Sequence, residues 1–170
     1  MLTVYYWHGE FWNWNERCYE KTSVEKLNAS VWAFLDAARC GSAADSSRFK
    51  PRPADAGAVI KCLKAGLALD LDPPCWVGGK KATDVVVFNN GIVDIETGEL
   101  MPLTPKLWAH DALEFDYDPD AKCPMWEKFL GEVFQDDAET VMCIEEQLGL
   151  GMTWDNRFQR AFLWIGPKGR

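Results

Sequence analysis

Residues 84–100 read DVVVFNNGIVDIETGEL, and this stretch constrains the fold more than any other part of the chain. Two runs of β-branched and apolar residues flank Asn90-Gly91, a dipeptide that favours a two-residue hairpin because both residues tolerate positive φ. A Thr97-Gly98 turn and a short third apolar step follow. The stretch therefore predicts a three-stranded antiparallel unit at the centre of the chain.

The N-terminal stretch VYYWHGEFWNWNERCYEK carries seven aromatic residues around two short polar turns. Aromatic residues favour strands, so this pattern predicts a small β-meander. Trp12 and Trp14 fall on one face of their strand because side chains alternate with a period of two.

Helical spacing of apolar residues predicts helices within residues 22–40, 54–69, 124–134 and 136–152. Thr22 or Ser23 can cap the first, and Pro124 suits the first turn of the third. Residues 41–54 are small, polar and punctuated by proline, as expected of a linker or exposed loop. Ala161–Ile165 is an apolar run that predicts a terminal strand. The fold class expected is α+β, mostly helical.

Composition narrows the class of protein. The chain has 170 residues, of which 48% are apolar, enough for one compact domain or two small ones. No apolar run reaches the ~18 residues of a membrane span, and no signal peptide is evident, which favours the cytoplasm without membrane partners. Six cysteines include no Cys-x-x-Cys pair and only two histidines accompany them, so reduced, buried thiols are favoured over zinc ligands. No metal site and no catalytic residue is predicted.

Charge is distributed unevenly along the chain. The net charge is −8, and residues 110–146 contain twelve acids against two lysines. After Met152 the only acid is Asp155, and four basic residues accompany it. We interpret the acidic stretch as a solvated helical face. The basic C-terminal part could attract an anion.

Several spaced motifs carry a resemblance to a known family. An Asn-Gly turn precedes a D-x-x-T-G hairpin, a Tyr-Asp-Pro-x-Ala-x-Cys-Pro loop precedes a Phe-Leu helix, and a Leu-Gly step closes the next helix before a Gln-basic-apolar run. The matching positions are Asn90, Gly91, Asp94, Thr97, Gly98, Tyr117–Pro119, Ala121, Cys123, Pro124, Phe129, Leu130, Leu148, Gly149 and Gln159–Gly166. In this order the motifs resemble the region just before the ATPase core of virus- and plasmid-encoded primase–helicases, superfamily 3, of the poxvirus and satellite-phage type.

The resemblance implies a domain plan. Residues 1–40 would form the aromatic hairpin plus a helix, 41–54 a linker, 55–153 an accessory or collar domain, and 154–170 the start of an AAA+-type ATPase domain. The phosphate loop of such ATPases reads Gly-x-x-x-x-Gly-Lys followed by Ser or Thr. Here the matching residues are Gly166, Pro167, Lys168, Gly169 and Arg170, so the loop is expected to be truncated. This chain would then hold no cofactor and hydrolyse no ATP. Its intact parent would form a homo-oligomeric ring, a hexamer, that binds ATP, magnesium and DNA.

Other interpretations stay open. Trp7, Trp12 and Trp14 could stack on bases of single-stranded DNA, although packing in the core is favoured. Arg157 and Arg160 could contact nucleotide or a neighbouring subunit. The whole chain could instead be a free-standing single-stranded DNA-binding module, which its net charge disfavours. It could also be a decoy or remnant that binds an intact helicase.

Overall fold

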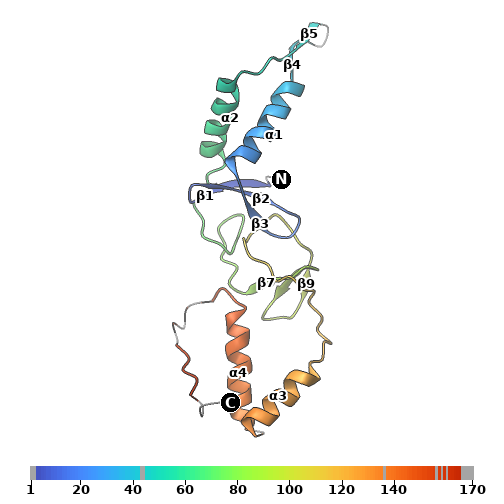
Figure 1. Ribbon diagram of the computed structural model, residues 1–170, viewed down its shortest axis with the longest axis vertical. Coiled ribbons are helices and arrows are strands. Elements are labelled where there is room, and N and C mark those ends of the chain that lie inside the picture. The colour runs from blue at the N-terminus through green and yellow to red at the C-terminus, as the bar shows by residue number, and fades with distance from the viewer. Residues whose placement is uncertain are drawn as a thin grey trace.

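The computed structural model describes residues 3–42, 45–135, 137–155, 157, 159 and 161–165. Figure 1 shows an elongated α+β molecule in which most of the short antiparallel sheets lie between two pairs of helices and one two-stranded hairpin lies at the tip. The helices are α1 (Val24–Ala37), α2 (Pro53–Gly66), α3 (Pro124–Phe134) and α4 (Ala138–Gly151). The strands are β1 (Val4–Trp7), β2 (Glu10–Trp14), β3 (Tyr19–Thr22), β4 (Arg39–Ser42), β5 (Asp45–Arg48), β6 (Cys75–Trp76), β7 (Val85–Val87), β8 (Ile92–Asp94), β9 (Leu100–Met101) and β10 (Leu107–Trp108).

The predicted N-terminal meander is confirmed as the antiparallel sheet β1-β2-β3. His8 and Gly9 join β1 to β2, and both have positive φ (46° and 86°), as the tightest hairpin turns require.

Both faces of this small sheet are apolar. On one face Tyr5 of β1 lies opposite Trp12 of β2, and Trp14 lies opposite Tyr19 of β3. The other face carries Phe11, which belongs to a separate cluster of buried side chains. The meander therefore needs a covering layer on each side.

Helices α1 and α2 cover the Phe11 face of the meander (Figure 1). Phe11 is fully buried against Val31 of α1 and Ile60 of α2. Ser23 caps α1 as predicted, since its hydroxyl accepts a hydrogen bond from the Lys26 amide at 3.2 Å. Pro53 opens α2, where the missing amide proton costs nothing.

A two-stranded sheet, β6-β10, joins the meander to the central sheet. Leu107 faces the central sheet while Trp108 faces the meander, because neighbouring strand residues point to opposite sides. The Tyr19 amide donates to the Ala109 carbonyl at 2.9 Å, which fixes β3 beside β10. These strands are two residues long each, too short for any periodic signal in the sequence to predict them.

The predicted central unit is confirmed as the antiparallel sheet β7-β8-β9. Its turn differs from the expectation, since neither Asn90 nor Gly91 is among the residues with positive φ. Glycine is required there by a close approach: a Cβ on Gly91 would lie 2.5 Å from the Met101 carbonyl oxygen. The second turn uses Asp94, whose Oδ1 accepts hydrogen bonds from the amides of Glu96 and Thr97 at 3.0 and 2.9 Å.

Helices α3 and α4 form a hairpin at the end of the molecule opposite the β4-β5 hairpin (Figure 1). Leu130 of α3 and Ile144 of α4 are the buried residues of the pair. Asp137 caps α4, since its carboxylate accepts a hydrogen bond from the Thr140 amide at 3.2 Å.

Two segments differ from the expectation. Residues 39–48, predicted as a helix end and linker, contain the hairpin β4-β5, whose small polar residues carry no strand signal of their own. Residues 161–165, predicted as a strand, are described without any strand pairing. A strand needs a hydrogen-bonded neighbour, and none lies beside this segment in the described part of the chain.

Candidate functional site

The three tryptophans predicted as a stacking platform pack around Trp108, which is 0% exposed. The ring centroids of Trp7 and Trp12 each lie 5.8 Å from that of Trp108, in edge-to-face geometry. Trp14 packs on Tyr19 at 5.3 Å. Such aromatic pairs add about 0.5–1.5 kcal/mol each beyond the area they bury. All three tryptophans are half-buried, so they contribute to the core of this region.

Basic groups beside this aromatic cluster are already engaged. Lys21 pairs with Glu10 at 2.9 Å, across the meander. Arg17 donates a hydrogen bond to the side chain of Asn89 in the central turn. Stacking of bases on the three meander tryptophans stays a prediction, and their surroundings offer it little positive charge.

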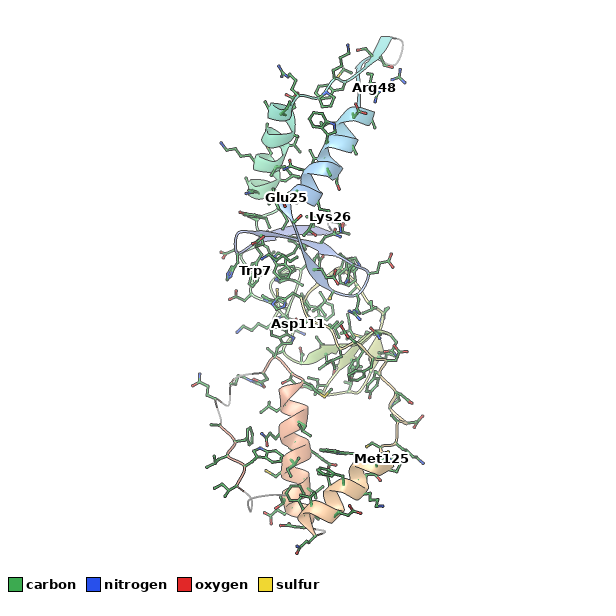
Figure 2. All side chains as sticks on the ribbon, in the orientation of Figure 1. Trp7, Glu25, Lys26, Arg48, Asp111 and Met125 are labelled. Carbon is green, nitrogen blue, oxygen red and sulfur yellow. The ribbon has the colours of Figure 1, made fainter. Side chains whose placement is uncertain are left out.

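His110 connects the aromatic cluster to the end of α4 (Figure 2 shows the neighbouring Trp7 and Asp111). Its ring centroid lies 5.4 Å from that of Trp12 and 5.1 Å from that of Trp154. Its Nδ1 lies 3.2 Å from the Asp111 carboxylate. The segment after α4 is thereby held against the body of the molecule.

Arg157 is fixed by Asp155 just beyond this contact. Its Nε lies 2.8 Å from Asp155 Oδ1 and its Nη2 lies 2.6 Å from Oδ2, a two-pronged ion pair. The guanidinium and amide of Arg157 lower the pKa of Asp155 to about 2. The pair lines an open groove of about 230 Å³ together with Thr83, Glu96 and Leu150. Arg157 therefore has a defined position beside the central sheet.

The remaining predicted site residues lie outside the described part of the chain. These are Arg160 and the partial phosphate loop Gly166, Pro167, Lys168, Gly169 and Arg170. Their roles stay predictions.

The motif residues that carry the resemblance have structural roles where they are described. The side-chain amide of Asn90 forms two hydrogen bonds with the backbone of Tyr117, in the way that a neighbouring strand would. It donates to the Tyr117 carbonyl and accepts from the Tyr117 amide, both at 2.9 Å. Gly98 takes a φ of 70° to close the turn that Asp94 organises. Pro124 is the first residue of α3. These motifs therefore specify turns and helix starts.

Cysteine and acidic side chains are the remaining residue types that could bind a metal. Among the described residues, no group of three or more His, Cys, Asp or Glu side chains could hold a metal ion. Cys18 and Cys75 are buried, and burial raises the pKa of both thiols. The expectation of buried thiols is wrong for the other four cysteines, which are exposed because the β4-β5 hairpin, the outer faces of α2 and α4 and the start of α3 leave them at the surface. In the described ranges, no helix is both long enough and apolar enough to cross a bilayer.

An exposed apolar surface lies on α3 and α4, where the sequence predicted no site. We call it the distal apolar surface, and its members are Met125, Phe129, Val133, Met142 and Leu148. Met125, labelled in Figure 2, is 86% exposed. Helix α3 carries the apolar stripe expected of a core face, but only its Leu130 position is buried. Large apolar side chains exposed on two neighbouring helices make this end of the molecule a candidate interaction surface.

The fold and its surfaces define a small α+β module. Its recognisable motifs stabilise turns, and side chains at both ends of the elongated molecule are exposed to solvent. Comparison with known families agrees: a family model described as D5 N terminal like matches residues 2–135. The chain belongs to this family, the N-terminal region of D5-like primase–helicases. No curated protein matches the chain.

Proposed function

We propose that the chain is the accessory region of a superfamily 3 DNA-replication primase–helicase, of the poxvirus and satellite-phage type. The observation that carries the proposal is the family match over residues 2–135. In the intact parent this region supports assembly of a homo-hexameric ring and its engagement of DNA, in the cytoplasm of the host cell. The chemistry belongs to the ATPase domain that follows.

The end of the sequence supports the connection to an ATPase. Gly166–Arg170 match the glycine and the four variable residues of a phosphate loop. The lysine that contacts the β- and γ-phosphates and the hydroxyl that ligates magnesium belong to the following positions. We therefore propose that ATP and magnesium bind only to the longer parent and that the 170-residue chain alone is inactive as an ATPase.

The coding DNA beyond codon 170 tests this proposal most directly. A frame that continues with Gly-Lys and then Ser or Thr supports it. A stop codon after Arg170 contradicts it and favours the decoy or remnant interpretation, which further requires co-purification with an intact helicase.

The distal apolar surface supports a role in assembly. It lies on the elements that directly precede the proposed ATPase, so a neighbouring domain or subunit is well placed to cover it. In the intact parent, Met125→Ser/Phe129→Ser is expected to weaken the ring, as measured by sedimentation velocity. Val77→Ser is the control, since Val77 is also an exposed apolar residue but lies outside α3 and α4. Equal ring formation by the wild type and both variants would refute this role.

Arg157 and Arg160 are proposed to contact nucleotide or the neighbouring subunit in that ring. The support is that both arginines closely precede the proposed phosphate loop in the sequence and that Arg157 is held by Asp155. Arg157→Ala/Arg160→Ala in the intact parent should lower ATPase activity or ring formation. Unchanged values of both would refute the assignment.

A further inference from the structure

The net charge of −8 conceals one strongly basic region. Residues 39–64 contain six basic residues (Arg39, Arg48, Lys50, Arg52, Lys61 and Lys64) and two acids (Asp45 and Asp55), a net charge of +4. The rest of the chain therefore carries −8 − 4 = −12. This segment forms the β4-β5 hairpin and α2, at the end of the molecule farthest from α3 and α4 (Figure 1).

Two arginines lie opposite each other across the hairpin, and no carboxylate among the described side chains pairs with both. Arg39 pairs in register with Arg48, and like charges in directly opposite positions destabilise a strand pair. Arg48 is partly neutralised by Asp36 of α1. Arg39 reaches only the Ser46 carbonyl, at 3.4 Å, and pairs with no carboxylate among the described residues. An anion would relieve this repulsion.

The base of the hairpin provides space for such an anion. An open hollow of about 280 Å³ is lined by Asp36, Ala37, Arg39 and Arg48. Figure 2 shows Arg48 at this end of the molecule, with other side chains projecting outward around it. Lys50 follows the hairpin and is exposed, and it has no carboxylate partner in the described ranges. Lys50 therefore adds a further exposed positive charge two residues after Arg48, which lines the hollow.

Exposed aromatic side chains lie on α1, the helix that leads into the basic hairpin. Phe34 is 73% exposed and lies in the last turns of α1, which ends at Ala37 directly before β4. Trp32, on the same helix, is 41% exposed. Aromatic rings interleaved with basic side chains are the usual means of binding unpaired bases and their phosphates together. This combination distinguishes the region from a solvated basic face.

From these observations we infer that the β4-β5 hairpin and the C-terminal turns of α1 form a binding surface for single-stranded DNA. Arg39 and Lys50 contact phosphates, and Phe34 stacks on a base. The inference rests on the proposed function for the identity of DNA as the ligand, and it gives DNA engagement a location different from the tryptophans of the meander. It also explains how an acidic chain could bind DNA locally.

The test measures binding of the 170-residue chain to fluorescein-labelled oligo(dT) by fluorescence anisotropy over a series of NaCl concentrations. Arg39→Gln/Lys50→Gln should weaken binding about tenfold and reduce the slope of log K against log[salt] by about 0.7 for each lost phosphate contact. Lys106→Gln/Lys122→Gln is the matched control, because it changes the net charge equally at exposed positions elsewhere. Phe34→Ala should weaken binding about tenfold without changing the salt slope. Circular dichroism checks that every variant keeps the wild-type fold.

Several results would overturn the inference. The first is that the wild-type chain does not bind oligo(dT) at the lowest salt concentration. The second is that the two double variants weaken binding equally. The third is that Phe34→Ala has no effect and the wild-type chain binds duplex DNA as tightly as oligo(dT). Failure of DNA binding is separable from failure of the proposed function. If the coding frame continues through Gly-Lys and Ser or Thr while the chain binds no DNA, the accessory-domain assignment stands and this surface is rejected.

Discussion

Gly91→Ala should destabilise the central sheet, although alanine is the smallest change a glycine can undergo. The added Cβ would lie 2.5 Å from the Met101 carbonyl oxygen and 2.6 Å from Leu100 Cδ1. Leu100 is exposed and its side chain can rotate away. The Met101 carbonyl belongs to β9, which pairs with β8 at Ile92, so it can retreat only by moving the strand.

The magnitude follows from that geometry. Real Cβ atoms essentially never approach another atom closer than 3.0 Å, so β9 must shift by about 0.5 Å. Overpacking in a closely packed region costs about 1–3 kcal/mol, and because the obstacle is backbone we expect a loss of about 3 kcal/mol. For a chain of this size that lowers the Tm by about 6–12 °C.

Thermal unfolding followed by circular dichroism measures this effect, and Gly57→Ala provides the control. Gly57 lies within α2, and its added Cβ would meet nothing within 4 Å. Alanine is favoured over glycine in a helix interior by about 0.5–1 kcal/mol, so the control should raise the Tm by a few degrees, about 1–4 °C. A Gly91→Ala protein as stable as the wild type would refute the close-approach explanation.

Other parts of the molecule give three further predictions. Trp108→Ala should cost about 3–5 kcal/mol, because it empties the centre of the aromatic cluster, and loss of the near-ultraviolet dichroism at unchanged α1-α2 helicity would locate the damage there. If Trp108→Ala leaves the Tm unchanged, the cluster is not a core. Hydrogen bonds from Thr97 and Glu96 lower the pKa of the Asp94 carboxyl, and Arg157 lowers the pKa of Asp155 to about 2. Each carboxylate therefore contributes stability that is complete above the unfolded pKa of about 3.9 and is lost as the pH falls through its own lowered pKa. Asp94→Asn should therefore flatten the acid limb of a Tm-against-pH profile, and an unchanged limb would contradict this. Removing the residues after Thr153 should improve solubility, since Leu163 and Ile165 are 84% and 87% exposed, and equal solubility of the long and short chains would count against it.

Local signals predicted much of the fold. The meander, the four helices and the central three-stranded sheet were all evident from periodicity and turn residues, and Ser23 and Pro124 mark their helix starts. Such signals act within a few residues, so one sequence is enough to read them. The reason for Gly91 was wrong because its constraint comes from Met101, a residue in a different strand.

The candidate sites were less accessible to prediction. The clustering of Trp7, Trp12 and Trp14 around Trp108 joins residues about a hundred positions apart, and no local period reports such a contact. The basic hairpin has the sequence pattern of a linker because its strands are short and polar. Its like-charged arginine pair depends on strand register, which only the folded chain reveals.

By itself, then, the amino-acid sequence determined the four helices, the two three-stranded sheets, the charge asymmetry and the family motifs, because each depends on residues close together in the chain. Only the tertiary structure decided which apolar faces are covered. It buried both faces of the meander between α1-α2 and Trp108, yet it left Met125 and Phe129 exposed. The physical reason is that a hydrophobic stripe specifies that something must cover it, whereas the identity of the covering surface depends on contacts between distant segments.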